Sequence, residues 1–499
     1  MSSHVRTVRP NQMVALMERA AHIKKMLEQG EKKPYKDVID VCWGDPHGAG
    51  MKPLTFVRQV LAACIYPQLL DGGNLPMDVK RRAQKLLRWC DGGSVGSYTN
   101  TGGILEIVEN LAQFISQRDG VPAHPENIWI HPGSQTSLTS ILTLLLSSEA
   151  TPKRGVLVPV PGHSTVPLSV AALGGVAAPY FLDEERGWEL RADELRRALA
   201  SARGVCRPVA LYVINPGNPT GHVQSRKSME EVIRFVAENN LFLLADEVYQ
   251  GSVYDANSEF VSYKKRLYEL GPPLAHTLEL ASFHSASKGL LGECGLRGGY
   301  VELLNMDPVV MPYVERLFHL IPSPPVTGQI ALELMVEPPQ PGDPSYPLYM
   351  HVSPKVHRNR SSDIQSAAPS MLDGSFPFPQ ETEHTRRTLV DNVKRVLQVL
   401  NRLPAISCQP VRGGAFAFPR LHLTTKAIRK AKDAGMQPDM FYCTKLLEDT
   451  GVFVSPGCEY GQKEGTYHIR FCIMTPTDTM EELLRRLSAF HLKFMKDLS

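Results

Sequence analysis

The order of apolar segments in the sequence predicts an α/β fold with a mostly parallel central sheet. Short apolar segments recur between residues 127 and 283, and stretches with helical spacing separate them. Strands that alternate with helices form right-handed crossover units, which give a largely parallel sheet. After about residue 335, helical segments alternate with only short strands, a pattern typical of a smaller α+β domain. We therefore expect a large domain with helices flanking its sheet and a second, smaller domain.

The composition indicates which kinds of partner the protein binds. The chain has 499 residues, of which 43% are hydrophobic and 21% are charged, enough to bury the cores of two or three domains. The 54 lysine and arginine residues nearly balance the 51 acidic residues, so no strong overall charge recruits nucleic acid or an anionic membrane. No apolar run approaches the length that spans a bilayer. We expect small-molecule partners, no nucleic acid and no membrane.

The cysteines and the N-terminal residues bear on the compartment. Nine cysteines, an odd number with no CxxC pair, argue against a secreted disulfide framework, and we predict no metal site. The first 30 residues lack the apolar core of a secretory signal. They are poor in acids up to Glu18, which leaves mitochondrial import as the alternative to the expected cytoplasmic location.

A helical arm is predicted over residues 1–30, because apolar side chains recur there at helical spacing: Met13, Leu16, Met17, Ala20, Ile23 and Leu27. We assign residues 31–75 and 335–499 to the smaller domain and residues 76–334 to the large domain. Strands are predicted in the large domain over residues 127–130, 155–160, 209–214, 241–247 and 278–283, and a helix over residues 228–240.

The ends of these strands carry candidate binding groups. After the strand 127–130, Gly133 turns the chain and Ser134 begins a helix whose free backbone N–H groups can hold a phosphate. The strand 209–214 leads into NPGNPTG, a proline-stiffened turn that could place the amide of Asn218 at the floor of a pocket. Each feature alone is weak, because NPGNPTG could be merely a tight turn.

Two further strand ends add an acid, a phenol and two cations. Asp246 lies at the end of an apolar strand with Tyr249 close behind it, although an acid in this position can also be a helix cap. The segment SFHSASK ends in Lys288, and Arg297 follows among glycines, as a solvated surface turn would also allow. Together, a phosphate cradle, an acid, a phenol, an amide and a lysine at successive strand ends match the needs of pyridoxal phosphate.

A long polar segment interrupts the C-terminal part. Residues 351–385 are rich in serine and lack periodicity, so we predict a disordered insertion there. Helical spacing resumes over residues 385–403, and short strands are predicted at 414–419 and 467–474.

Several motifs resemble one enzyme family. NPGNPTG, ADEVYQ and SFHSASKG followed by LRGGY are similar to motifs of the aspartate-aminotransferase superfamily, pyridoxal-phosphate enzymes of fold type I. KPLTFVRQVLA, LDEERGW, CRPVALYVINPGNPTG and GTYHIRF resemble the alanine aminotransferases. The likeness runs from about residue 30 to the C-terminus, apart from the polar segment. It implies transamination between L-alanine and 2-oxoglutarate with pyridoxal 5'-phosphate as the cofactor.

The resemblance implies a role for each candidate residue around the cofactor. Lys288 would bind the cofactor as a Schiff base and then carry the proton from the substrate Cα. Asp246 would keep the pyridine nitrogen protonated, and Tyr249 and Asn218 would hydrogen-bond the phenolic oxygen. The phosphate would be bound by Arg297, Ser285 and the helix start at Ser134 and Gln135.

The resemblance also implies how the substrate and a second subunit are bound. Arg470 matches the family arginine that pairs with the substrate α-carboxylate as a bidentate fork, although an arginine on an edge strand would look the same. Gly44 lies in the WGDP turn, where the family backbone approaches the substrate beside Asn218. Tyr98 matches the tyrosine that reaches the phosphate of the neighbouring subunit, which implies a homodimer with shared active sites.

Some positions depart from the family pattern. His163 stands in PVPGHSTV where alanine aminotransferases usually carry a tyrosine that stacks on the cofactor ring. The helix start reads GSQT and includes Gln135, where the close family has alanine then serine, and Val108 stands where the family has a basic residue. Two alternatives therefore stay open: a fold type I aminotransferase with another amino-acid preference, and a catalytically degenerate dimeric paralogue. No GxGxxG follows a strand, which argues against a dinucleotide-binding dehydrogenase.

Overall fold

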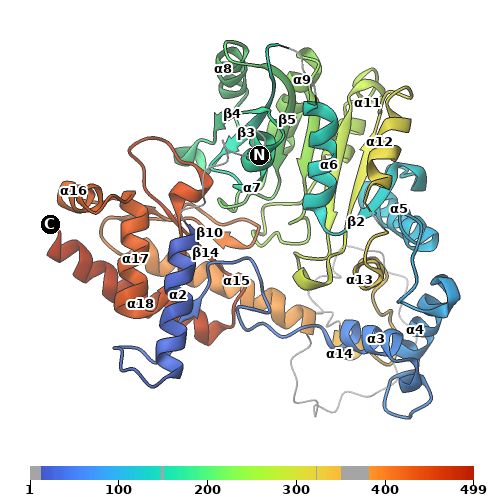
Figure 1. The fold of residues 1–499 in the computed structure, drawn as a ribbon, viewed down its shortest axis with the longest axis horizontal. Coiled ribbons are helices and arrows are strands. Elements are labelled where there is room, and N and C mark those ends of the chain that lie inside the picture. The colour runs from blue at the N-terminus through green and yellow to red at the C-terminus, as the bar shows by residue number, and fades with distance from the viewer. Residues whose placement is uncertain (1–12, 148–150, 322, 350–380) are drawn as a thin grey trace, which may run out of the picture.

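A seven-stranded sheet forms the centre of the large domain (Figure 1). The structure is a computed structural model that describes residues 13–147, 151–321, 323–349 and 381–499. In spatial order the strands are β2 (Ile128–His131), β8 (Gly299–Leu304), β7 (Leu280–Ser285), β6 (Phe242–Asp246), β5 (Arg207–Ile214), β3 (Arg154–Val160) and β4 (Val176–Phe181). Strand β8 runs antiparallel to both neighbours, and the other pairs are parallel. The predicted α/β fold with a mostly parallel sheet is confirmed.

Helices cover both faces of this sheet because its strands are apolar on both sides. In β3, Val156 and Val158 pack on one face and Leu157 packs on the other, as the alternation of side chains along a strand requires. The first face is covered by α6 (Ser134–Leu146), α7 (Thr165–Ala172) and α12 (Met311–His319). The second is covered by α8 (Ala192–Arg203), α9 (Arg226–Glu238) and α10 (Tyr263–Glu269), and the short helix α11 (Leu274–Thr277) adjoins α10.

A helical group packs at the β2–β8 side of the sheet. It consists of α3 (Thr55–Ile65), α4 (Met77–Trp89), α5 (Leu105–Asp119) and α13 (Val326–Val336), with α14 (Tyr346–Tyr349) beside α3 (Figure 1). Helix α3 lies in the segment 31–75, which we assigned to the smaller domain. Its apolar side chains pack with α4, α5 and α13 rather than with the C-terminal elements.

The C-terminal part forms a separate apolar core with the N-terminal helix (Figure 1). Its helices are α2 (Met13–Glu28), α15 (Glu381–Leu400), α16 (Thr425–Asp433), α17 (Pro438–Thr450) and α18 (Thr477–Asp497). Its short strands are β1 (Ile39–Asp40), β9 (Ile406–Ser407), β10 (Phe416–Ala417), β11 (Arg420–Leu421), β12 (Val452–Phe453), β13 (Ser455–Pro456) and β14 (Ile469–Cys472). Strand β1 pairs in parallel with β12, which joins the N-terminal segment to the C-terminal core.

Two helices show how far the predicted arm and the predicted insertion agree with the structure. Helix α2 lies within the predicted arm and buries four of its six apolar positions, whereas Met17 is 38% exposed and Leu27 is half-buried. Helix α15 begins at Glu381, so residues 381–385 are helical although we placed them in the insertion. Residues 1–12 of the arm and residues 351–380 of the insertion lie outside the described residues.

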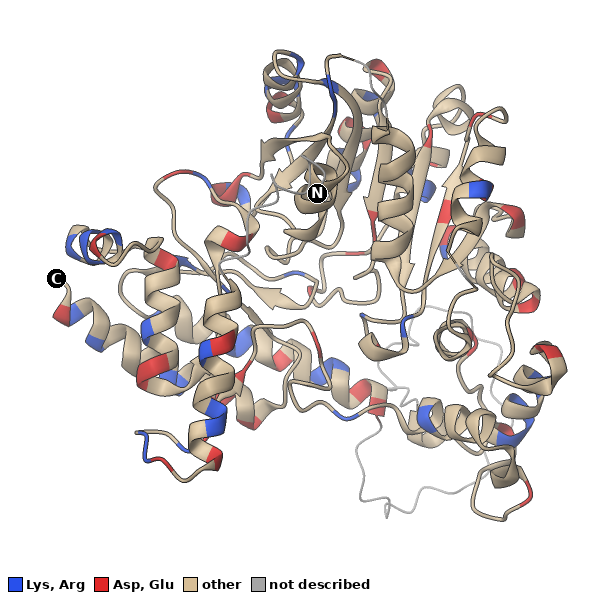
Figure 2. Cartoon of the chain, in the orientation of Figure 1, with Lys and Arg blue, Asp and Glu red and all other residues tan. Residues whose placement is uncertain are grey.

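Charged residues of both signs are spread over the molecule. In the view of Figure 2, lysine and arginine (blue) and aspartate and glutamate (red) both lie on helices of the two domains. Among the described helices, none is long and apolar enough to cross a membrane. All nine cysteines carry free thiols.

Candidate active site

Lys288 lies just beyond the carboxyl end of β7 and meets the N-terminal segment there. Its Nζ donates a hydrogen bond to the carbonyl oxygen of Gly44 at 2.6 Å. A Cβ atom at Gly44 would lie 3.2 Å from this Nζ and 2.6 Å from a ring carbon of Phe416. Any side chain at Gly44 would therefore fill the space between the lysine and the C-terminal core.

Asp246 ends β6 and is fixed by a hydrogen bond from the neighbouring strand. The hydroxyl of Tyr212 donates to its Oδ2 at 2.6 Å, and the backbone N–H of Val248 donates to Oδ1 at 3.3 Å. Burial raises the pKa of Asp246, while Tyr212, the Val248 N–H and the charge of Lys288 act in the opposite direction. The two hydrogen bonds thus hold the carboxylate in one orientation at the end of β6.

Tyr212 is not among the site residues predicted from the sequence. Its signal is a phenol in the middle of the apolar strand VALYVI, two residues before Ile214, which pairs with Asp246 in the sheet. Positions two apart share a face of a strand, so this tyrosine lies on the same face as the acid of the neighbouring strand.

Arg470 is buried between aromatic rings, with only 5% of its surface exposed. Its guanidinium carbon lies 3.8 Å from the ring centre of Phe416 and 4.4 Å from that of Tyr460. Nη2 donates to the carbonyl oxygen of Cys42 at 2.6 Å and Nη1 donates to Oδ1 of Asn218 at 3.2 Å. The buried Nε has no hydrogen-bond partner among the described residues, and each Nη has a second N–H, so the guanidinium keeps donors for a carboxylate.

The strand that carries Arg470 is not an edge strand. Strand β14 pairs with β10 on one side and with β13 on the other, and all its residues are buried. The alternative of an exposed edge arginine is therefore wrong. Tyr249 is also buried here, with its ring 6.4 Å from that of Phe416, and burial raises the pKa of its phenol.

The start of helix α6 lies beside Arg297. Gly133 precedes the helix with a φ of +89°, and no side chain caps the first turn. Arg297 donates from Nη2 to the carbonyl oxygen of Pro132 at 3.1 Å, and a Cβ at Gly133 would lie 2.4 Å from that nitrogen. Ser285 ends β7 directly opposite Gly299 of β8. Uncapped N–H groups, a guanidinium and a hydroxyl form a donor set that suits a phosphate.

His163 and Gln135 contact each other through a third residue. Thr165 Oγ1 lies 2.5 Å from Nδ1 of His163 and donates to Oε1 of Gln135 at 3.0 Å. Burial, with the charges of Arg470 and Lys288, lowers the pKa of His163 to about 4. The imidazole is therefore neutral at pH 7. The side chain of Gln135 is directed to α7, and only its backbone N–H belongs to the helix start.

Two of the singled-out positions lie apart from this site. Tyr98 is 82% exposed in the loop before α5. Val108 is buried among the apolar side chains of α3, α4, α5 and α13, where a basic residue would lose its hydration.

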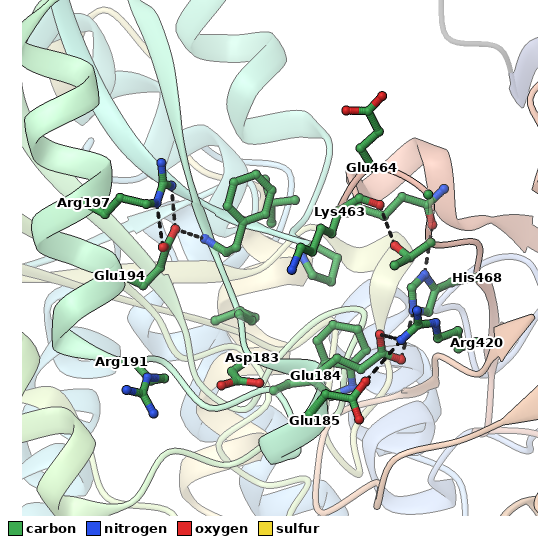
Figure 3. A pocket seen from close by; sticks show the side chains of 18 of the residues that line it. Asp183, Glu184, Glu185, Arg191, Glu194, Arg197, Arg420, Lys463, Glu464 and His468 are labelled. Carbon is green, nitrogen blue, oxygen red and sulfur yellow. Dashed lines mark hydrogen bonds and ion pairs between the residues drawn. The ribbon is translucent and has the colours of Figure 1, made fainter.

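A hollow of about 770 Å³ lies elsewhere, and none of the predicted site residues line it (Figure 3). It is bounded by the 3₁₀ turn Glu184–Arg186, by α8 and by residues 462–466. Its three arginines pair with carboxylates of the same wall: Arg420 with Glu184, Arg197 with Glu194 and Arg191 with Asp193. These arginines already have carboxylate partners, whereas the strand-end site has a lysine, an acid and an uncapped helix start, so the strand-end site is the better candidate for catalysis.

A mostly parallel sheet with a lysine, an acid and a phosphate-binding helix start at its strand ends defines a pyridoxal-phosphate enzyme of fold type I. The sequence pattern of the family described as aminotransferase class I and II matches residues 62–340. Alanine aminotransferase 2 of Xenopus laevis is 45% identical over 482 residues, which cover 96% of this chain and 84% of the relative. Alanine aminotransferase 1 of Homo sapiens is 44% identical over 500 residues, covering 100% and 95%.

Solved structures agree in fold. The alanine aminotransferase of Pyrococcus furiosus superimposes with a TM-score of 0.71 at 19% identity, covering 100% of both chains. The chain belongs to the class I and II aminotransferase family, whose cofactor is pyridoxal 5'-phosphate. The residues present fit this group, because the uncapped start of α6 beside Arg297 suits its phosphate and the carboxylate of Asp246 suits its ring nitrogen.

Proposed function

We propose that this aminotransferase transfers an amino group between L-alanine and 2-oxoglutarate, giving pyruvate and L-glutamate. The frog and human relatives named alanine aminotransferase, at 45% and 44% identity, support this choice of substrates. The observation that carries the proposal is Arg470, a buried guanidinium that keeps donors for a carboxylate beside Lys288 and Gly44. Such a group suits the carboxylate that L-alanine and 2-oxoglutarate share.

The residues around that carboxylate have distinct tasks in the proposal. Arg470 orients the substrate so that its Cα faces Lys288, whose Nζ removes the proton from Cα of L-alanine and, in the second half of the cycle, delivers a proton to the Cα of the new L-glutamate. The cofactor, when bound, supplies the electron sink for the pair released at Cα. Asp246 would keep a proton at the ring nitrogen of the bound cofactor, and Tyr249 and Asn218 would hydrogen-bond its phenolic oxygen.

We further propose a homodimer in which Tyr98 contributes to the site of the partner. The 82% exposure of Tyr98 in the single chain supports this, because it leaves the ring accessible to a second subunit. Apolar side chains on α3, α4 and α5 are exposed too: Ile65, Met77 and Leu105. The cytoplasm is the proposed location, supported by the nine free thiols.

The absorption spectrum of the purified protein with pyridoxal 5'-phosphate tests the function. We expect a yellow form that depends on Lys288, that L-alanine converts to a form absorbing in the near ultraviolet, and that 2-oxoglutarate restores. L-aspartate and glycine are the comparison substrates at the same concentration. Conversion by one of these but not by L-alanine would mean another amino-acid preference. No colour with added cofactor would mean a degenerate paralogue.

A further inference from the structure

A hydrogen-bonded chain of side chains runs from the end of β3 to the start of α6. It consists of His163, Thr165 and Gln135, with distances of 2.5 Å from His163 Nδ1 to Thr165 Oγ1 and 3.0 Å from Thr165 Oγ1 to Gln135 Oε1. The chain connects two of the positions at which this sequence departs from the family pattern. It also connects the residue after β3 with the helix start that suits a phosphate.

The direction of these hydrogen bonds follows from the other contacts of Gln135. Its Nε2 donates to the hydroxyl of Thr139 at 3.4 Å and to that of Ser169 at 3.3 Å. Oε1 is the atom that faces Thr165, and the hydroxyl proton of Thr165 is donated to it. Because a hydroxyl has one proton, the oxygen of Thr165 can only accept from His163, which requires the proton of the imidazole on Nδ1.

The remaining nitrogen of the imidazole is then fixed as well. A neutral imidazole with a proton on Nδ1 has a bare Nε2 that accepts hydrogen bonds. The ring is neutral at pH 7, because burial and the charges of Arg470 and Lys288 lower its pKa to about 4. A phenol in this position would instead carry a donor.

We propose that Thr165 and Gln135 are positioning residues that hold His163 as the neutral Nδ1–H tautomer, with Nε2 left as an acceptor for a donor in the active site. The proposal rests on the proposed function in so far as it places His163 against the cofactor. In this arrangement the imidazole of His163 takes the place of the larger tyrosine ring that stacks on the cofactor in the family. The orientation of the imidazole is maintained by the hydrogen bonds that link it through Thr165 of α7 to Gln135 of α6.

Histidine-selective nitrogen NMR of the cofactor-free and cofactor-loaded protein tests the tautomer directly. The signals of His163 are identified by their loss in His163→Gln. We expect the Nδ1–H pattern in the parent and a mixture of both tautomers in Thr165→Val, which keeps the shape and removes the hydroxyl. An Nε2–H pattern in the parent overturns the proposal. This measurement does not depend on the reaction, so it separates the proposal from the proposed function.

The dissociation constant of pyridoxal 5'-phosphate tests the positioning role. Thr165→Val and Gln135→Leu should weaken cofactor binding roughly three- to tenfold, the loss expected for one hydrogen bond. Thr165→Ser should restore binding to within about twofold of the parent, since it restores the hydroxyl. Thr143→Val is the matched control, because that hydroxyl donates to the Thr139 carbonyl in the same helix, outside the chain to His163.

Melting temperatures measured without cofactor show whether a variant is simply unfolded. If Thr165→Val melts like Thr143→Val yet binds the cofactor as tightly as the parent does, the positioning role is overturned. The same conclusion holds if Thr165→Ser binds as weakly as Thr165→Val, because the hydroxyl would then be irrelevant. If neither the parent nor any variant forms the yellow species that requires Lys288, the proposed function is wrong, but the tautomer result is unaffected.

Discussion

At the scale of single residues, the two cations of the site differ in how they are held. Lys288 makes one hydrogen bond to a backbone carbonyl, which leaves its Nζ able to move to another partner. Arg470 is enclosed by Phe416 and Tyr460 and donates to two fixed oxygens, so its plane cannot rotate freely. The first arrangement suits a group that carries a proton, and the second suits a group that orients a substrate.

We expect Arg470→Lys to weaken substrate binding much more than cofactor binding. The ammonium of lysine is a point charge and cannot replace the planar fork of the guanidinium. We expect kcat/KM for L-alanine to fall by a factor that corresponds to a loss on the order of 1–3 kcal/mol of transition-state stabilisation. Steady-state kinetics and a cofactor titration measure the two effects separately. Arg420→Lys, on β11 outside the site, is the control and should change neither. Equal losses of substrate and cofactor affinity in Arg470→Lys would mean that Arg470 is structural.

His163 gives a prediction about pH. Its ordinary pKa is near 6.5, and in the fold it is lowered to about 4. Between about pH 6.5 and pH 4, His163 is protonated in the unfolded chain but not in the folded chain. The free energy of unfolding therefore falls as the pH is lowered through this range. Above about pH 5, His163 should stay neutral and should not alter cofactor affinity.

The ratio of cofactor dissociation constants for the parent and His163→Tyr isolates this effect. We expect a constant ratio from pH 7.5 to about 5.5, with tighter binding by tyrosine because its ring is larger, and a rising ratio only below about pH 5. A change of the ratio centred near pH 6.5 would contradict a buried, neutral imidazole. His163→Ala controls for loss of the ring.

The sequence predicted those site residues whose motifs are short and follow strands. Lys288, Asp246 and Asn218 each end or follow an apolar run, and strand ends meet at one edge of a parallel sheet. Tyr212 and Thr165 could not be predicted in the same way. Their partners lie 34 and 30 residues away, and only the sheet register and the packing of α6 on α7 bring them together.

At the scale of elements, β8 shows where sequence patterns fail. Its sequence GYVELL contains Glu302, which reads as an exposed residue, yet its side chain is 1% exposed and pairs with Lys264 of α10, which is fully buried. The charge is tolerated because a helix distant in sequence supplies its partner. Strand β4 was missed too, since VAAPYF carries a proline and a weak apolar pattern.

The pair between Lys264 and Glu302 gives a prediction about stability. Lys264→Met leaves a buried carboxylate without its partner, and we expect a loss of about 3–5 kcal/mol in the free energy of unfolding. Denaturant unfolding at fixed protein and cofactor concentration measures it. Lys264→Met with Glu302→Leu should recover most of the loss. Arg234→Met, which breaks the exposed pair with Glu230 on α9, is the control and should cost less than about 1 kcal/mol.

At the scale of the whole molecule, the site is built from both ends of the chain. Gly44 and Cys42 come from the N-terminal segment, Arg470 comes from β14, and Lys288 and Asn218 come from the large sheet. Periodicity predicted five of the seven strands of the large sheet but not this convergence, because the pairing of β1 with β12 is a contact of two residues in each strand. The family resemblance supplied what local patterns could not.

The proposed sharing of sites between subunits leads to a test with two inactive variants. Lys288→Ala should lose turnover because the proton carrier is absent, and Tyr98→Ala should lose cofactor phosphate contact in the site of the partner. In a mixed dimer, one site combines the intact Lys288 of one subunit with the intact Tyr98 of the other.

Unfolding and refolding the two variants together should therefore restore activity that neither has alone. Random pairing gives half mixed dimers with one intact site each, so we expect about a quarter of the parent activity. Refolding each variant separately, and mixing them without unfolding, are the controls. Recovery no greater than the sum of the separate variants would mean that Tyr98 acts within its own subunit or not at all, and the exposure of its ring would then need another partner.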